Sequence, residues 1–184
     1  GVVPADDKAW DLWFEAAIDP DLTASVIKAD DLVTIESNKN LKTLFTKLIC
    51  RLEKTISAST KENKETDYVQ TTRAVQYLTR LFSVVANDSA TCAKLLLDKD
   101  YELADGTLGR RLVDSLLSLL FLNGYTMTAD AKGDALWESG LGASENPPLA
   151  SHQAKIRRAK VMRALMTMSS ATLYSTPEAS MPIG

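Results

Sequence analysis

The spacing of apolar residues constrains the fold most strongly, because these residues recur at steps of three and four along several stretches of the chain. Between residues 38 and 57 they fall on one side of a helix of about five turns. This stripe consists of Leu41, Leu44, Phe45, Leu48, Ile49, Leu52 and Ile56. The basic residues of the same stretch lie off the stripe. The pattern predicts an amphipathic helix that packs by one face.

The same spacing predicts several further helices. They cover residues 7–18, 67–86, 89–97, 107–122 and 151 to a point before Pro177, with two short pieces between 22 and 36. The apolar stripe of the 67–86 helix is Val75, Leu78, Leu81, Phe82 and Val85. The 107–122 helix is apolar over more than half of its circumference, which predicts a central position with neighbours on several sides. The expected inner face of the last helix is Ile156, Ala159, Met162, Leu165, Met166 and Leu173.

The arrangement of these helices follows from their links. No stretch alternates apolar and polar residues over the length of a strand. Consecutive long helices with short links favour antiparallel neighbours. We therefore predict an all-α single domain over residues 1–184, made of stacked antiparallel helical hairpins in an irregular bundle or an armadillo-like solenoid. We expect residues 175–184 to form an extended tail, and the whole to be an N-terminal fragment of a longer protein.

Charge and composition exclude several classes of protein. The net charge of −3 argues against a dedicated nucleic-acid-binding protein, which concentrates positive charge on one surface. No apolar run approaches the roughly 18 residues of a membrane span. Asp6, Asp7 and Lys8 interrupt any signal peptide. Cys50 and Cys92 are too few for a disulfide framework, so we expect both to be reduced and buried, in a cytosolic protein.

The side chains needed for catalysis or metal binding are sparse. The one histidine, His152, lies at a predicted helix start, where a surface or capping role is expected. Residues 98–109 begin with alternating acids, but Leu103 and Gly109 stand where a calcium loop needs glycine and glutamate. The turn 140–142 lacks the third glycine of a dinucleotide site. We predict no catalytic residue, no cofactor and no metal. An enzyme would require a polar pocket that joins the histidine to a cysteine or to two carboxylates.

One cluster of charge stands out near the end of the chain. Five basic residues crowd into the first half of the last predicted helix: Lys155, Arg157, Arg158, Lys160 and Arg163. One interpretation is a solvated helix face. The alternative is an electrostatic docking surface for an acidic partner or an anionic membrane, where each such residue contributes about 1 kcal/mol.

A set of short motifs resembles a known family. Residues 136–142 read Leu-Trp-Glu-Ser-Gly-Leu-Gly, and a proline pair, a basic-apolar helix and the segment 173–177 (Leu-Tyr-Ser-Thr-Pro) follow. The motif residues are Trp137, Glu138, Gly140, Gly142 and Tyr174. Together they resemble the N-terminal region of the high-temperature-induced dauer-formation (Hid-1) family. Further stretches at 10–14, 78–81, 119–121 and 125–127 agree in order; the dymeclin family is less similar.

This resemblance implies a function. Hid-1 proteins are peripheral proteins on the cytosolic side of the Golgi, helical scaffolds in protein sorting and secretory vesicle formation without known enzymatic activity. It also implies partners in the Golgi trafficking machinery and an N-terminal myristoyl glycine. Ala5 stands where that lipidation signal needs serine or threonine after Gly1, so we expect the anchor upstream. One acyl chain binds membranes only marginally, which makes the basic stretch 155–163 our candidate second contact. We expect Trp137 to fill a gap between hairpins.

Overall fold

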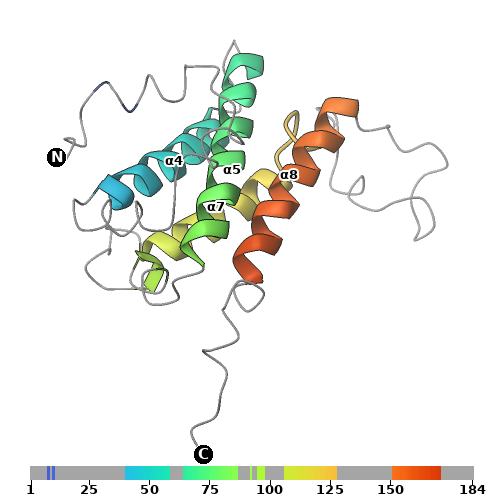
Figure 1. The fold of residues 1–184 in the computed structure, drawn as a ribbon. Helices are drawn as coiled ribbons and strands as arrows, with labels where there is room; N and C mark the ends of the chain where they lie inside the picture. Colours follow the sequence, from blue (N-terminus) through green and yellow to red (C-terminus); the bar gives the residue numbers. More distant parts are fainter. Residues whose placement is uncertain are drawn as a thin grey trace, which may run out of the picture.

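The computed structural model describes residues 8, 10, 40–58, 64–86, 92, 95–97, 106–127 and 151–170. Within them lie the helices α4 (Asn40–Ser57), α5 (Lys64–Val85), α7 (Leu108–Leu120) and α8 (His152–Ser169) (Figure 1). The described part of the chain contains no strand; its isolated bridges include one between Asn123 and Met127. The prediction of an all-α fold is therefore confirmed.

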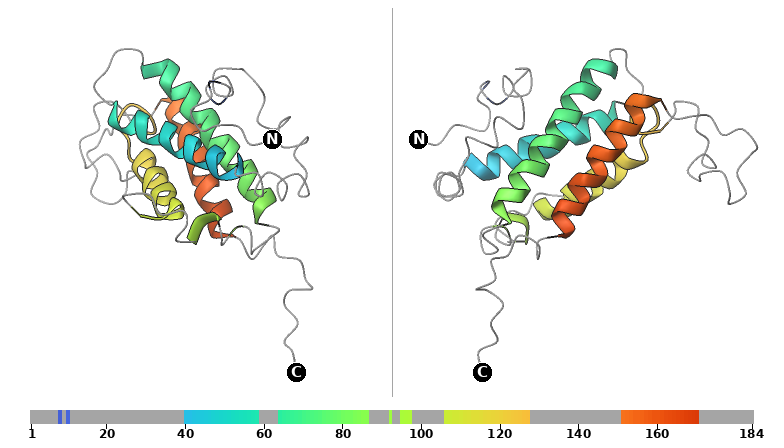
Figure 2. Two further views of the ribbon diagram at one scale, coloured as in Figure 1. Left: turned by 90° about the vertical axis from the view of Figure 1, so that its left-hand side faces the viewer. Right: turned by 45° about the vertical axis from the view of Figure 1, so that its right-hand side comes forward.

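The helices form two antiparallel pairs, α4 with α5 and α7 with α8 (Figure 1). The pairs stack so that α4 lies against α7 and α5 lies against α8, and the stacked helices run in the same sense (Figure 2). Contacts thus close a ring of four helices. This arrangement agrees with the predicted stacking of helical hairpins.

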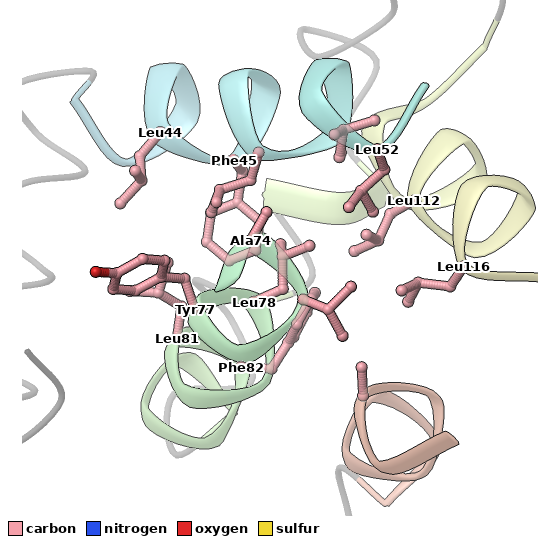
Figure 3. Close-up of a cluster of buried hydrophobic side chains, with 14 of the residues drawn as sticks. Leu44, Phe45, Leu52, Ala74, Tyr77, Leu78, Leu81, Phe82, Leu112 and Leu116 are labelled. Carbon is pink, nitrogen blue, oxygen red and sulfur yellow. The ribbon is translucent and has the colours of Figure 1, made fainter. Parts of the chain in front are cut away.

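The core forms where the stripes of α4 and α5 meet (Figure 3). Phe45 and Phe82 pack edge to face, with ring centres 5.2 Å apart and an interplanar angle of 81°. This geometry suits the charge distribution of aromatic rings. Thr55 and Thr71 share a buried hydrogen bond of 2.5 Å, which satisfies two hydroxyls that burial would otherwise penalise. The stripes predicted for these two helices are buried, with only Ile56 partly exposed.

Ion pairs reinforce two of the helix contacts. Arg111 of α7 donates from Nε and Nη2 to the two carboxylate oxygens of Glu53 on α4, at 2.9 and 2.5 Å. Arg51 of α4 donates to Asp67 of α5 at 2.6 Å. The first pair is bidentate, so it fixes the direction of the side chains as well as their distance.

Helix α7 differs from its prediction. Leu108, Leu112, Leu116 and Leu119 are buried against the neighbouring helices, and Thr107 caps the first turn. On the opposite face Val113, Leu117 and Phe121 are 36%, 43% and 52% exposed. The expectation of a surrounded, central helix is wrong because α4 and α8 pack on the same side of α7, and no described residue covers the other.

Smaller differences concern helix ends and a cysteine. Helix α5 begins at Lys64, three residues before the predicted start, while α4, α7 and α8 begin within two residues of theirs. Cys50 is exposed on α4, so the expectation that it is buried is wrong. The predicted tail 175–184 and most of the predicted N-terminal helix 7–18 lie outside the described residues.

Candidate functional site around Arg157

The inner face of α8 is not the predicted one. Its buried residues are Ala154, Arg157, Val161, Ala164 and Thr167. Of the residues that we expected inside, Ala159, Met162 and Met166 are exposed, whereas Ile156 and Leu165 are partly buried. Leu173 lies outside the described residues. The prediction was wrong because it ranked residues by hydrophobicity. The helix instead packs through small side chains, which allow a close approach, and through one long arginine.

Arg157 is the central residue of this interface. It is 6% exposed although it is a charged side chain. Its guanidinium carbon lies 5.0 Å from the ring centre of Tyr68 and 5.5 Å from that of Tyr125. A guanidinium at such distances is attracted by the negative faces of the rings. Arg157 Nη2 also donates to a carboxylate oxygen of Glu65, which pairs the charge at the surface. The cation is therefore enclosed by an aromatic pair and one carboxylate.

The second tyrosine comes from the turn that follows α7. Gly124 N donates to Met127 O at 3.0 Å, which closes the turn. The hydroxyl of Tyr125 shares a hydrogen bond of 3.0 Å with Thr72 on α5. Gly124 has φ +81°, and a Cβ there would lie 3.1 Å from Tyr68 Oη. Glycine is needed because it adopts this backbone region readily and leaves room for the tyrosine.

Both rings stay neutral at physiological pH. Burial raises the pKa of Tyr125 to about 12, although the hydrogen bond with Thr72 and the charge of Arg157 act in the opposite direction. Burial also raises the pKa of Tyr68, and the nearby carboxylate of Glu65 adds to this, while Arg157 lowers it. Because both tyrosines are neutral, their contact with the cation of Arg157 does not change over the physiological pH range.

The five basic residues of α8 do not form one surface. Arg157 is buried as described. Arg158 donates to the carbonyl oxygen of Thr126 at 2.9 Å, and Lys160 donates to Gln76 Oε1 at 3.2 Å. Lys155 and Arg163 are exposed. Three of the five therefore hold α8 to its neighbours, and two remain on the outer face.

Beside Arg157 lies an open groove of about 330 Å³ between α5 and α8. Helix α5 lines it with Glu65, Val69, Thr72, Arg73 and Gln76. Helix α8 lines it with Gln153, Ile156, Arg157 and Lys160. Three cations and one carboxylate thus border the groove, which gives it a positive surplus. Burial lowers the pKa of Lys160, since a partly buried ammonium loses hydration.

Other expectations about the site fall in different places. Ser151 accepts a hydrogen bond from Ala154 N at 3.1 Å and caps α8, and His152 is exposed beside it, as expected. The groove lining includes neither His152 nor a cysteine. Among the described residues, no three acids, histidines or cysteines gather as metal ligands would. The motif residues Trp137, Glu138, Gly140, Gly142 and Tyr174 lie outside the described residues.

Sequence reasoning missed Tyr68, Tyr125 and Glu65 as members of the site. Glu65 lies before the predicted helix 67–86, and Tyr125 lies beyond the predicted helix 107–122, so the apolar spacing predicts no packing for either residue. The position of Tyr68 was an available signal, because it lies about two helical turns before Val75, on the same side of the helix as the predicted stripe of α5. No local pattern signals Tyr125, since only the tertiary fold brings residue 125 next to residue 72.

None of the described helices combines the length and the apolar character needed to cross a membrane. Figure 2 shows α5 and α8, the two helices that line the groove, side by side.

The comparisons with known proteins give one extended match. The family model described as "High-temperature-induced dauer-formation protein", Hid1, matches residues 2–183. The Ubp5-interacting protein ftp105 of Schizosaccharomyces pombe is 29% identical over 75 residues, which are 39% of this chain and 8% of the relative's own length. No solved structure matches. Since the family model covers almost every residue, the chain belongs to the Hid1 family of high-temperature-induced dauer-formation proteins.

Proposed function

We propose that this chain is a helical scaffold module of a Hid1-family protein, which binds other proteins at the cytosolic face of the Golgi. There it serves protein sorting and secretory vesicle formation, together with partners of the trafficking machinery. The observation that carries the proposal is the family match over residues 2–183. The chain covers only a small part of its curated relative, so this role belongs to the whole protein.

Two observations support binding as the activity. The relative in Schizosaccharomyces pombe is named for its interaction with Ubp5, so that relative binds another protein. The groove between α5 and α8 presents hydrogen-bond donors, cations and two apolar side chains together. Such mixed concave surfaces are typical of recognition sites. The proposed role is therefore binding rather than catalysis.

Imaging of the whole protein in cells tests the location, with Golgi and endoplasmic reticulum markers beside it. The proposal expects overlap with the Golgi marker, and slower export of a secretory cargo when the protein is depleted. The cargo defect should be rescued by the whole protein but not by a version that lacks this chain. Uniform cytosolic signal together with normal cargo export would contradict the proposal.

A specific observation favours a second role as a membrane-surface module. The outer face of α8 carries the cations Lys155 and Arg163 beside Met162 and Met166, which are 48% and 65% exposed. Cations and exposed apolar side chains on one helix face suit an anionic membrane surface. Flotation with phosphatidylserine vesicles at low salt tests this role. Binding should disappear in the double variant Lys155→Glu, Arg163→Glu, and unchanged binding removes the hypothesis.

A further inference from the structure

The groove between α5 and α8 has the dimensions of a recognition site. Its volume of about 330 Å³ lies at the lower end of the range for ligand pockets, which suits one or two side chains of a bound segment. Both walls are helices that pack against each other, so the groove exists before any ligand arrives. Binding there costs little ordering of the protein.

The charges around the groove are not balanced. Arg157 is paired with Glu65, the one acid of the lining. Arg73 makes no hydrogen bond or ion pair with another described residue, and Lys160 is bonded only to the neutral amide of Gln76. Two cations therefore face the groove without a carboxylate among the described residues. A bound anion would provide a negatively charged partner for Arg73 and Lys160.

The position of Lys160 strengthens this point. Its side chain is partly buried beside α5, and burial lowers its pKa because the ammonium has lost part of its hydration. Gln76 offers one carbonyl oxygen at 3.2 Å, which replaces only a fraction of that hydration. A carboxylate in the groove would form a charge-assisted hydrogen bond with this ammonium.

The rest of the lining fits a peptide. Val69 is 40% exposed and Ile156 is partly exposed, so an apolar side chain can be covered beside the cations. The amide groups of Gln76 and Gln153 can exchange hydrogen bonds with a polypeptide backbone. The cations open to a membrane surface, Lys155 and Arg163, are exposed outside the groove lining.

We propose that this groove docks an acidic segment of a protein partner, with an aspartate or glutamate carboxylate between Arg73 and Lys160 and an adjacent apolar side chain on Val69 and Ile156. The inference deepens the proposed scaffold function and rests on it for the nature of the partner. The preference for a carboxylate and an apolar side chain follows from the residues that line the groove.

A peptide array tests the proposal directly. The fluorescently labelled 184-residue chain is applied to immobilised short peptides that pair aspartate or glutamate with varied neighbours, beside matched asparagine and glutamine peptides. We expect binding to acidic peptides that also carry an apolar residue, and loss of signal in the amide versions. The best peptide then gives a Kd by fluorescence anisotropy, which should weaken as salt rises.

Two charge-reversed chains with equal net charge locate the site. Arg73→Glu, Lys160→Glu alters the groove, and Lys155→Glu, Arg163→Glu alters the outer face. The groove variant should weaken peptide binding by about tenfold or more, and the outer-face variant by less than about threefold. Circular dichroism checks that both variants are folded. If the groove variant unfolds, the single variant Arg73→Gln replaces it, because Arg73 makes no hydrogen bond or ion pair with a described residue whose loss would destabilise the fold. This variant should still weaken peptide binding severalfold.

The outcomes separate the alternatives. Equal loss in both double variants, or no acidic peptide bound, overturns the groove proposal. Binding of anionic vesicles that depends on Arg73 and Lys160, without peptide binding, overturns it in favour of a lipid headgroup. Golgi imaging of the whole protein is independent of these results, so the groove can fail while the scaffold function stands.

Discussion

The guanidinium carbon of Arg157 lies 5.0 Å from the ring centre of Tyr68, so that a cation of α8 rests on an aromatic ring of α5. This relationship decides how α8 is rotated about its axis. With Arg157 inside, Met162 and Met166 face outward and Lys160 borders the groove. The rotation of one helix therefore determines both surfaces for which we propose functions.

The one-sided packing of α7 predicts different costs for two neighbouring leucines. Leu116→Ala removes a fully buried side chain and should lower the free energy of unfolding by about 2–5 kcal/mol. Leu117→Ala removes a side chain that is 43% exposed and should cost less than about 1 kcal/mol. Urea denaturation followed by circular dichroism measures both. Similar costs would mean that both faces of α7 are covered.

Two adjacent arginines on α7 provide a second comparison. Arg111→Lys loses the bidentate contact with Glu53 and should lower the free energy of unfolding by about 1 kcal/mol. Arg110→Lys alters an exposed pair with Asp114 at 3.7 Å and should have an effect near zero. Thermal melts of the two variants in parallel give the answer. An equal shift in both would show that the geometry at Arg111 contributes nothing.

Tyr125 predicts a pH dependence of stability. Its pKa is raised from 10.0 to about 12, so the folded state retains a proton that the unfolded state loses first. This stability is fully present below pH 10 and is lost as pH rises toward 12, by about 2–3 kcal/mol in total. Urea midpoints across this range should fall more steeply for the natural chain than for Tyr125→Phe. Parallel curves for the two proteins contradict the assignment.

Gly124 should tolerate no side chain. Gly124→Ala places a Cβ 3.1 Å from Tyr68 Oη at a backbone angle of φ +81°, and should cost about 1–2 kcal/mol. Ser118→Ala, on the exposed side of α7, is the control and should stay within about 0.5 kcal/mol. The midpoints of thermal unfolding report both changes. A neutral Gly124→Ala would indicate that the turn adopts another conformation.

The sequence predicts much of the fold because apolar spacing is a local property. The apolar stripe residues of α4 from Leu41 to Leu52 and of α5 from Val75 to Val85 are buried, as their spacing requires. The predicted helix starts near Thr107 and Ser151 coincide with side chains that cap the helices. The site is harder to predict, because a buried arginine looks like a surface residue until its partners are known. Tyr125, Tyr68 and Glu65 precede Arg157 by between 32 and 92 residues along the chain, and only packing brings such residues together.

The inward position of Arg157 is the claim on which the orientation of α8, the groove and the outer face all depend. A double-mutant cycle between Arg157→Met and Tyr68→Leu tests it most directly, with the free energy of unfolding measured for all four proteins. We expect each single change to destabilise the fold and the pair to show a coupling of about 1 kcal/mol, because the cation and the ring are in direct contact. Strict additivity, with Arg157→Met as mild as Arg163→Met, would contradict the account.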